Sequence, residues 1–394
     1  MTRIRRAPTL VIAPDSFKGS LDAPAVSAAI ARGMARVWPN ADIRICPMAD
    51  GGEGTLDAVL SSGTGPGQQA GTARRSCTVT GAGGARKAAA YGLLSALDGP
   101  TAVIETAQIV GITDAAGMAV DVAHRSTRGV GELVRALLDD GVRRFMIGLG
   151  GSSTNDGGAG MLAALGLRLR DPAGGEVTPT PQGLAALARV DADGLDPRLG
   201  ECTITILSDV DNPLCGPHGA TATFGPQKGV REDAIAAFDA TLARYARITE
   251  AAVGREAATN LGAGAAGGLG FALQLVGATP RAGAEVVADL VGLDAALQGA
   301  DWLITGEGRS DVQTLGGKAP FVVARRARAA GVAPTLLSGA VDPAALPDLG
   351  RVFAGCFALP AGPMTLAECI ERAETLLADR AEQIARLWAA ARGE

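Results

Sequence analysis

The stretch TLVIAPDSFKGS, residues 9–20, sets the pattern from which the fold can be predicted. A short apolar run, typical of a buried strand, is followed by a polar turn, and an alanine-rich helix is expected from about residue 22 to 38. The same order returns at IRICPM (43–48), which precedes ADGGEG and another expected helix. Strands that alternate with helices in this way indicate parallel sheets covered by helices, so we predict an α/β fold.

The alternation continues along the chain. Further strands are expected at TAVIETA (101–107), RRFMIGL (143–149), CTITILSDV (202–210), DWLITGEG (301–308), TLLSGAV (335–341) and VFAGCFAL (352–359). A long helix is expected at about 365–392. Residues 65–92 are glycine-rich and less periodic, and we interpret them as the entry into a second domain.

Composition excludes several classes of function. The chain has 394 residues, 47% of them hydrophobic, and a net charge of −5, which gives no field to attract nucleic acid or an anionic membrane. The six cysteines are far apart and form no CxxC pair, which favours reduced thiols over a zinc site. The apolar run near the N-terminus is too short for a signal peptide, and no segment is long enough to span a membrane. We therefore expect a cytoplasmic protein.

Lysine is rare in this chain. Of 36 basic residues only Lys18, Lys87, Lys228 and Lys318 are lysines. Three of them stand beside glycines, in SFKGS, GPQKG and GGKAP. We interpret those three as functional and Lys87 as a surface residue.

Acids, small hydroxyl residues and glycines follow five of the expected strands. Ligands bind beyond the carboxyl ends of the strands in open α/β sheets, so these loops are candidate site residues. The same residue types also cap helices and form turns, which is an alternative for any single loop. The loops contain Asp15, Ser16 and Lys18; Asp50 and Glu53; Ser152–Asp156; Asp209, Asp211 and Asn212; and Glu307, Arg309, Asp311 and Lys318.

The densest glycine stretch is IGLGGSSTNDGGAGML (147–162), with six glycines around Asp156. Glycine-rich turns let backbone N–H groups point at phosphate oxygens, so this stretch predicts a cradle for a phosphate chain. Aspartate and asparagine oxygens suit Mg²⁺, and lysines offset charge on a transferring phosphoryl group. The loops together therefore favour phosphoryl transfer.

Competing motifs have less support. The P-loop pattern GxxxxGK[ST] is absent, and neither His124 nor His218 lies near serine and aspartate partners for a catalytic triad. GAGAAG (262–267) matches GxGxxG and would favour an NAD(P)-dependent dehydrogenase, but the segment before it does not resemble a strand. A non-enzymatic ligand-binding or sensor protein would not need acids in five loops together with three retained lysines.

Six motifs together resemble the bacterial type-1 glycerate kinase family and occur in its order: VIAPDSFKGS, MADGGEGT, GLGGSSTNDGGAGM, DVDNPLCGPHGATATFGPQKG, GAGAAGGLGF and ITGEGRSDVQTLGGKAP. The resemblance implies ATP- and Mg²⁺-dependent phosphorylation of D-glycerate, most often at the 2-position. It also implies a Rossmann- or flavodoxin-like parallel-sheet domain, residues 1–60 plus 285–394, with an inserted α/β domain, residues 61–284. The site is expected in the cleft between them.

The resemblance also suggests roles for individual residues. Glycerate would be bound by Asp15, Ser16, Lys18, Gly51, Gly52, Glu53 and Arg309. ATP would be bound by Gly150, Gly151, Ser152, Ser153, Thr154, Asn155, Lys228, Glu307 and Lys318. The metal would be held by Asp156, Asp211, Asn212 and Asp311. The catalytic residues would be Asp156, our choice for the general base, with Lys18, Asp50 and Asp211.

Three points stay open in the sequence. A 3-kinase, or a kinase of a related small hydroxy acid, would carry the same loops. Asp156 cannot be distinguished from Asp211 or Asp50 as the base. A homo-oligomer is possible, and we expect no partner beyond the small-molecule substrates.

Overall fold

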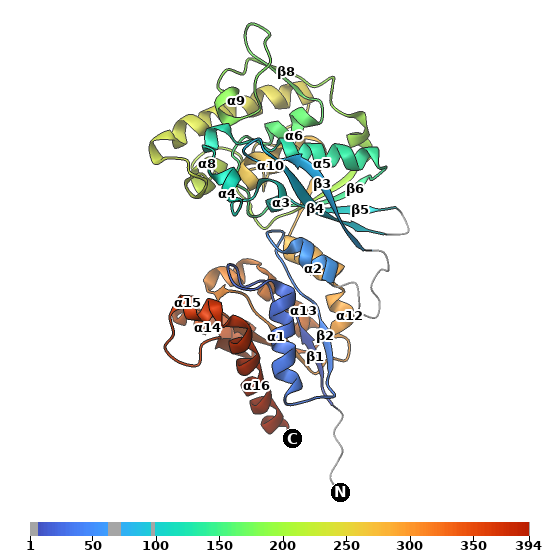
Figure 1. Cartoon of the computed structure of the whole chain (residues 1–394), viewed down its shortest axis with the longest axis vertical. Helices are drawn as coiled ribbons and strands as arrows, with labels where there is room; N and C mark the ends of the chain where they lie inside the picture. The colour runs from blue at the N-terminus through green and yellow to red at the C-terminus, as the bar shows by residue number, and fades with distance from the viewer. Residues whose placement is uncertain (1–6, 62–71, 96–98, 394) are drawn as a thin grey trace. The chain divides into compact units, whose positions relative to one another are not determined.

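The computed structural model describes residues 7–61, 72–95 and 99–393. The described residues form two compact units (Figure 1). The first unit takes its described residues from Met1–Asp50, Asp57–Gln68 and Ala284–Glu394, and the second from Gly51–Leu56 and Gln69–Gly283. Both ends of the described chain therefore contribute to the first unit.

The first unit is built on a parallel sheet of five strands. Its order is β15-β13-β11-β1-β2, and every neighbouring pair runs parallel. The strands are β1 (Thr9–Ile12), β2 (Asp42–Ile45), β11 (Trp302–Thr305), β13 (Ala333–Ser338) and β15 (Gly355–Ala358). Their carboxyl ends lie at one edge of the sheet, where the predicted ligand loops begin.

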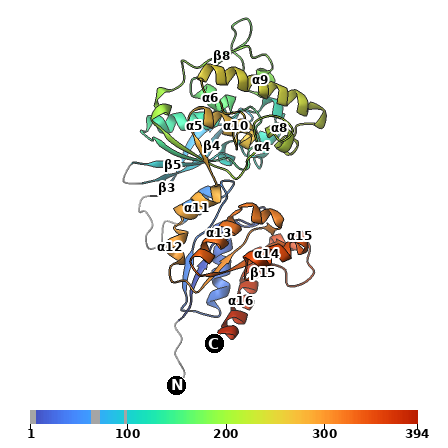
Figure 2. The same cartoon turned by 180° about the vertical axis from the view of Figure 1, so that it is seen from behind.

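Helices cover both faces of this sheet. Leu10 and Ile12 pack into a core with α1 (Ala23–Ala35) and α16 (Ala373–Arg392), which lie side by side (Figure 1). Val11 and Ala13 pack into a second core with α11 (Gly283–Leu290), α12 (Leu293–Leu297) and α13 (Ala319–Ala329) (Figure 2). Successive strand residues point to opposite faces, so a strand that is apolar throughout requires two helical layers.

The second unit has a mixed sheet of six strands in the order β10-β9-β6-β5-β4-β3. Its strands are β3 (Ala73–Thr80), β4 (Arg86–Leu94), β5 (Thr101–Glu105), β6 (Arg144–Gly148), β9 (Thr203–Leu207) and β10 (Thr279–Arg281). The pairs from β5 to β10 are parallel, whereas β4 runs antiparallel to both β3 and β5. The longest helices of the unit are α5 (Arg128–Asp139), α9 (Ile235–Val253) and α10 (Ala265–Leu275).

The remaining elements are short. The helices are α2 (Thr55–Ser61), α3 (Ala107–Val110), α4 (Ala115–Met118), α6 (Ala159–Ala164), α7 (Pro181–Leu184), α8 (Ala220–Phe224), α14 (Leu346–Val352) and α15 (Leu366–Glu371). Two small sheets pair β7 (Arg168–Arg170) with β8 (Arg189–Asp191) and β12 (Arg309–Ser310) with β14 (Ala340–Val341).

The predicted α/β class with parallel strands is confirmed, but three details differ. The described part of residues 65–92 forms the antiparallel hairpin of β3 and β4. The strand expected at 43–48 ends at Ile45. The helix expected at 365–392 is two helices, α15 and α16, which adjoin at Arg372.

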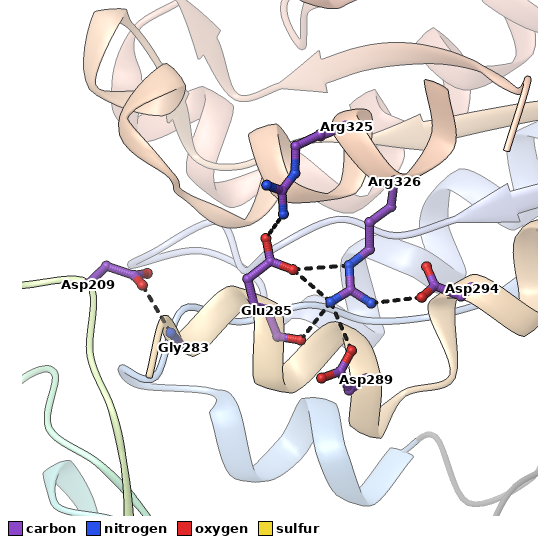
Figure 3. A network of polar contacts seen from close by, with 7 residues as sticks. All are labelled: Asp209, Gly283, Glu285, Asp289, Asp294, Arg325 and Arg326. Atoms are coloured by element: carbon purple, nitrogen blue, oxygen red, sulfur yellow. Dashed lines mark hydrogen bonds and ion pairs between the residues drawn. The ribbon is translucent and has the colours of Figure 1, made fainter. Parts of the chain in front are cut away.

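Helix α11 begins at Gly283, the last residue of the second unit, and polar contacts hold it (Figure 3). The Gly283 amide donates to Oδ1 of Asp209 at 2.9 Å. Arg326, on α13, donates to Glu285 at 2.6 Å, and its ion pairs extend to Asp289 and Asp294 (Figure 3). Asp209, predicted within a ligand loop, therefore stabilises the start of this helix.

Candidate active site

The loops after β1 and β11 lie together because their strands are neighbours in the first unit. The pairing continues past the strand ends, where the Asp15 amide donates to the Gly306 carbonyl at 2.8 Å. Asp15 and Glu307 are buried, Ser16 is half-buried and Lys18 is exposed. The structure thus brings two of the predicted ligand loops to the same edge of the sheet.

The carboxyl group of Asp15 lies in surroundings that disfavour its charged form. Burial raises its pKa to about 8, and the negative charges of Asp50 and Glu307 add to the effect. The Ser16 amide, which donates to Oδ1 at 2.6 Å, and the charge of Lys18 act in the opposite direction. A carboxyl group whose pKa is near neutral, and on which the charge of a lysine acts, is suited to proton transfer.

Glu307 is the centre of a second polar group in this unit. Its Oε1 accepts hydrogen bonds from Ser310 Oγ at 3.0 Å and from Thr314 Oγ1 at 2.6 Å. Lys318 Nζ lies 3.7 Å from its Oε2. Burial raises the pKa of Glu307, while the Thr314 hydrogen bond and the Lys318 charge oppose that shift. Glu307 and Lys318, both predicted to bind ATP, are therefore neighbours.

Arg309 and Asp311 follow Glu307 but differ in their surroundings. Arg309 is exposed, and its Nη2 lies 3.8 Å from Asp342 Oδ2. Asp311 caps the short 3₁₀ helix Val312–Gly316, where its Oδ1 accepts from the Gln313 amide at 2.8 Å. The structure gives Asp311 a capping role and leaves Arg309 accessible to a ligand.

In the second unit, two glycine loops approach each other closely. The Gly150 amide donates to the Gly51 carbonyl at 3.2 Å. A Cβ atom on Gly150 would lie 2.4 Å from Gly52 Cα, and one on Gly148 would lie 2.6 Å from the Gly51 oxygen. These glycines are therefore required where backbone packs on backbone. Glu53, in the same loop, is exposed.

Glu105 is a residue that sequence reasoning missed. It lies at the end of β5 and is buried, and its two carboxylate oxygens accept from the amides of Gly54 and Leu56, both at 3.2 Å. It therefore fixes the loop that carries Gly51, Gly52 and Glu53. The signal was present in the sequence, because Glu105 is an acid at the carboxyl end of an expected strand.

The glycine stretch after β6 is mostly interior. Gly151 is exposed and Gly150 is half-buried, whereas all residues from Ser152 to Gly160 are buried. Ser153 Oγ donates to the Val110 carbonyl at 2.9 Å, and Asn155 Nδ2 donates to Thr221 Oγ1 at 2.9 Å. The accessible part of the expected phosphate cradle is thus limited to its first two glycines.

Asp156 is fully buried and receives hydrogen bonds from several donors. Its Oδ2 accepts from the amide of Thr127 at 2.7 Å, from the Thr127 hydroxyl at 2.9 Å and from the Gly160 amide at 3.1 Å, and its Oδ1 accepts from the Gly158 amide at 3.1 Å. Burial raises the pKa of Asp156, and these hydrogen bonds oppose that shift. A carboxylate used in this way joins the starts of α5 and α6, which disfavours Asp156 as a base or a metal ligand.

Lys228 contacts the same stretch from the interior of the second unit. It is buried, and its Nζ donates to the Thr154 carbonyl at 2.8 Å and to Ser152 Oγ at 3.1 Å. Arg125, which sequence reasoning also missed, is buried beside it and donates to the Ser153 carbonyl at 3.0 Å. No feature of the sequence distinguishes this arginine from the many others.

The loop after β9 contains the remaining metal candidates. Asp211 is exposed, and Asn212 Nδ2 donates to the His218 carbonyl at 2.7 Å. Within the described residues there is no group of three or more His, Cys, Asp or Glu side chains that could hold a metal ion. The donors present suit Mg²⁺, which usually binds through one or two carboxylates together with phosphate oxygens.

The GAGAAG segment forms a left-handed turn at the start of α10. Ala266, Gly267 and Gly268 all have positive φ, and a Cβ atom on Gly267 would lie 2.0 Å from the Thr154 oxygen. The segment packs against the Thr154–Asn155 backbone and does not follow a strand. This disfavours the dinucleotide-binding interpretation.

Comparison with known proteins identifies the family. The Glycerate kinase family model matches residues 10–389. A glycerate kinase of Bacillus subtilis is 40% identical over 95% of this chain and 96% of its own length. A glycerate 2-kinase of Escherichia coli is 41% identical over 81% of this chain and 82% of its own.

The structural comparison agrees. A crystal structure ascribed to glycerate kinase 2 from Salmonella typhimurium LT2 has a TM-score of 0.84 and 39% identity, covering 99% of this chain and 100% of that one. In the described part of the chain, no helix is long and apolar enough to cross a membrane. The resemblance seen in the sequence motifs is thereby confirmed, and the chain belongs to the glycerate kinase family.

Proposed function

We propose that this kinase transfers the γ-phosphoryl group of ATP to the 2-hydroxyl of D-glycerate with the help of Mg²⁺. The observation that carries the proposal is the family match from residue 10 to 389. The name of the Escherichia coli relative, glycerate 2-kinase, supports the choice of the 2-hydroxyl. The lysines and carboxylates at the strand ends are the groups that such a reaction needs.

We assign the general base to Asp15 rather than Asp156. Asp15 is buried beside Asp50 and Glu307 and within the electrostatic reach of Lys18, and its pKa of about 8 is close to neutral. In its ionised form it would accept the proton of the attacking hydroxyl. Lys18 and Lys318 would offset the charge of the phosphoryl group, and Arg309, which is exposed, would bind the glycerate carboxylate.

Asp211 is the residue that we propose for Mg²⁺. It is an exposed carboxylate, so a metal ion that arrives with ATP can reach it. When bound, Mg²⁺ would neutralise charge on the phosphates.

The product assay tests the reaction and its regiochemistry together. Purified protein is supplied with ATP, Mg²⁺ and D-glycerate, and enolase alone converts any 2-phosphoglycerate to phosphoenolpyruvate. We expect a phosphoenolpyruvate signal without phosphoglycerate mutase. A signal only after mutase is added would mean the 3-hydroxyl, and no ADP in either case would mean another hydroxy acid.

The Asp15→Asn variant tests the assignment of the base. We expect kcat to fall by about 10²-fold or more, the usual contribution of a positioned base. Asp22→Asn is the matched control, because Asp22 caps α1 with an accepted hydrogen bond from the Ala25 amide and asparagine caps helices equally well. An Asp15→Asn enzyme that keeps the wild-type kcat would remove Asp15 from this role.

A second pair of variants separates Asp211 from Asp156. Asp211→Asn should lower turnover by more than about tenfold, with a matching rise in the Mg²⁺ concentration required, while thermal stability stays the same. Asp156→Asn should lower thermal stability, because the new amide presents N–H donors to the amides and hydroxyl that now donate to the carboxylate. The reverse result, with stability lost only in Asp211→Asn, would exchange the two roles.

A further inference from the structure

Two cations are buried in the second unit behind the glycine stretch that follows β6. Arg125 is 3% exposed and Lys228 is 2% exposed. Within the residues that the structure describes, neither forms an ion pair with a carboxylate, although the charge of Asp156 favours the protonated form of Lys228. Burying a cation costs free energy, so two of them in one place require an explanation.

Both cations contact the backbone of the same short segment. Arg125 Nη1 donates to the Ser153 carbonyl at 3.0 Å and also to the Lys228 carbonyl at 2.9 Å. Lys228 Nζ donates to the Thr154 carbonyl at 2.8 Å and to Ser152 Oγ at 3.1 Å. Segment Ser152–Thr154 is therefore held from within the unit by two positive charges.

This segment continues directly from the accessible turn of Gly150 and Gly151. Two backbone hydrogen bonds to neighbouring segments also fix the turn. The Gly150 amide donates to the Gly51 carbonyl at 3.2 Å, and the Ile112 amide donates to the Gly151 carbonyl at 2.7 Å. Gly151 has a φ of +72°, which glycine adopts without strain. The exposed turn is thus a fixed surface with buried positive charge behind it.

The electrostatics favour an anion at this turn. A charge surrounded by protein is screened much less than one on the surface, so the potential of Arg125 and Lys228 extends to the nearby turn. Burial lowers the pKa of Lys228 to about 7, and Asp156 opposes that shift. A bound polyphosphate would favour the protonated lysine further.

We propose that Arg125 and Lys228 are positioning residues, which fix the Ser152–Thr154 backbone and supply the positive potential with which the Gly150–Gly151 turn receives the phosphates of ATP. The proposal rests on the proposed function, since it takes the polyanion to be a nucleoside triphosphate. In place of the direct contact with ATP predicted for Lys228, it gives this buried residue a supporting role in the interior of the unit.

Equilibrium binding of ATP with Mg²⁺, measured by calorimetry on the full chain, tests the proposal. We expect Lys228→Met, which keeps the length of the side chain but removes its charge, to weaken ATP binding about tenfold or more. Lys228→Gln keeps a hydrogen-bond donor without the charge, so its Kd for ATP should lie between those of Lys228→Met and wild type. The Kd of D-glycerate should change by less than about twofold in both variants.

Arg244→Met is the matched control. Arg244 also donates to backbone carbonyls of the second unit, those of Leu184 and Ala185, both at 2.6 Å, but it does not contact the Ser152–Thr154 segment. We expect its loss to lower the thermal unfolding temperature and to leave the Kd of ATP unchanged. If Arg244→Met weakens ATP binding as much as Lys228→Met, the effect is general destabilisation and the proposal is wrong.

Further outcomes separate this proposal from the proposed function. Folded Lys228→Met and Lys228→Gln proteins with wild-type affinity for ATP would overturn the positioning role while leaving glycerate phosphorylation intact. A wild-type protein that binds ATP but does not phosphorylate D-glycerate would overturn the function, and the Kd values would still decide the role of the cations.

If Lys228→Met does not fold, a second pair of variants tests the proposal. Arg125→Lys, which keeps the charge, should bind ATP at least about fivefold more tightly than Arg125→Gln. Equal affinities would contradict the proposal.

Discussion

At the scale of single residues, Asp15 connects stability to pH. Its carboxyl group has a pKa of about 8 in the folded protein against 3.8 as an ordinary carboxyl group, so the folded state holds the proton more tightly. The stabilisation from this group is complete below about pH 3.8 and is lost as the pH rises through 8. Asp15→Asn, which never ionises, should therefore gain stability relative to wild type between pH 5 and pH 9, by about 1 kcal/mol or more.

Thermal unfolding at the two pH values measures this difference. Asp22→Asn, at an exposed helix cap in the same region of the chain, is the control for the general effect of exchanging aspartate for asparagine. An Asp15→Asn protein that is destabilised equally at pH 5 and pH 9 would mean that the carboxyl group is already ionised at pH 5.

Gly267 gives a second prediction at this scale. It has a φ of +67°, and a Cβ atom would lie 2.0 Å from the Thr154 oxygen, so alanine adds both strain and a clash with backbone. We expect Gly267→Ala to lower the free energy of unfolding by more than about 2 kcal/mol. Gly174 has a φ of +84°, and a Cβ atom there would have nothing within 4 Å, so alanine adds backbone strain without a clash. Gly174→Ala should therefore cost about 1 kcal/mol. Equal losses in urea unfolding would show that Thr154 moves aside.

The same glycines show what the sequence could predict about the site. The acids and lysines at strand ends were identified because their composition departs from that of ordinary turns. Close backbone packing and phosphate binding both require glycine, and residue types do not separate them. The structure distinguishes the two requirements, because Ser152–Asp156 is buried whereas Gly151 is exposed. Arg125 was missed because only its burial distinguishes it from other arginines.

At the scale of elements, Arg326 joins α13 to α11 and α12. Its side chain is 14% exposed and contacts Glu285, Asp289 and Asp294, whereas the side chain of neighbouring Arg325 is 61% exposed and pairs with Glu285 (Figure 3). Arg326→Met leaves three carboxylates close together and should destabilise the first unit by about 2 kcal/mol or more. Arg325→Met should cost less than about 1 kcal/mol, as exposed pairs do.

Urea unfolding followed by tryptophan fluorescence suits this comparison, because Trp38, Trp302 and Trp388 all pack in the first unit. The expected difference follows both from the burial of Arg326 and from the three carboxylates that it contacts. Losses of similar size in the two variants would show that the network around Arg326 is as accessible to solvent as Arg325.

Elements were predicted best where the local pattern decided the structure. The strands at 9–12 and 302–305 are buried on both faces, and such uniform apolar runs are recognisable from sequence. The hairpin of β3 and β4 was missed because β3 is an edge strand with many exposed polar residues. The break before α16 was missed because Thr365 and Glu368 cap only the six-residue α15, and the residues that follow are themselves good helix formers.

At the scale of the whole molecule, each unit has hydrophobic cores of its own. Leu133, on α5, is buried in the core of the second unit, and Leu377, on α16, is buried in a core of the first. Removing either side chain should cost about 2–5 kcal/mol, but within one unit only. We therefore expect calorimetry to resolve two thermal transitions. Leu133→Ala should lower the midpoint temperature of one transition, and Leu377→Ala should lower that of the other. Leu387→Ala, at a side chain that is 65% exposed on α16, should shift neither. A single transition that moves as a whole with either core substitution would mean that the units unfold together, and a bound substrate would then stabilise the entire chain rather than the unit that contacts it.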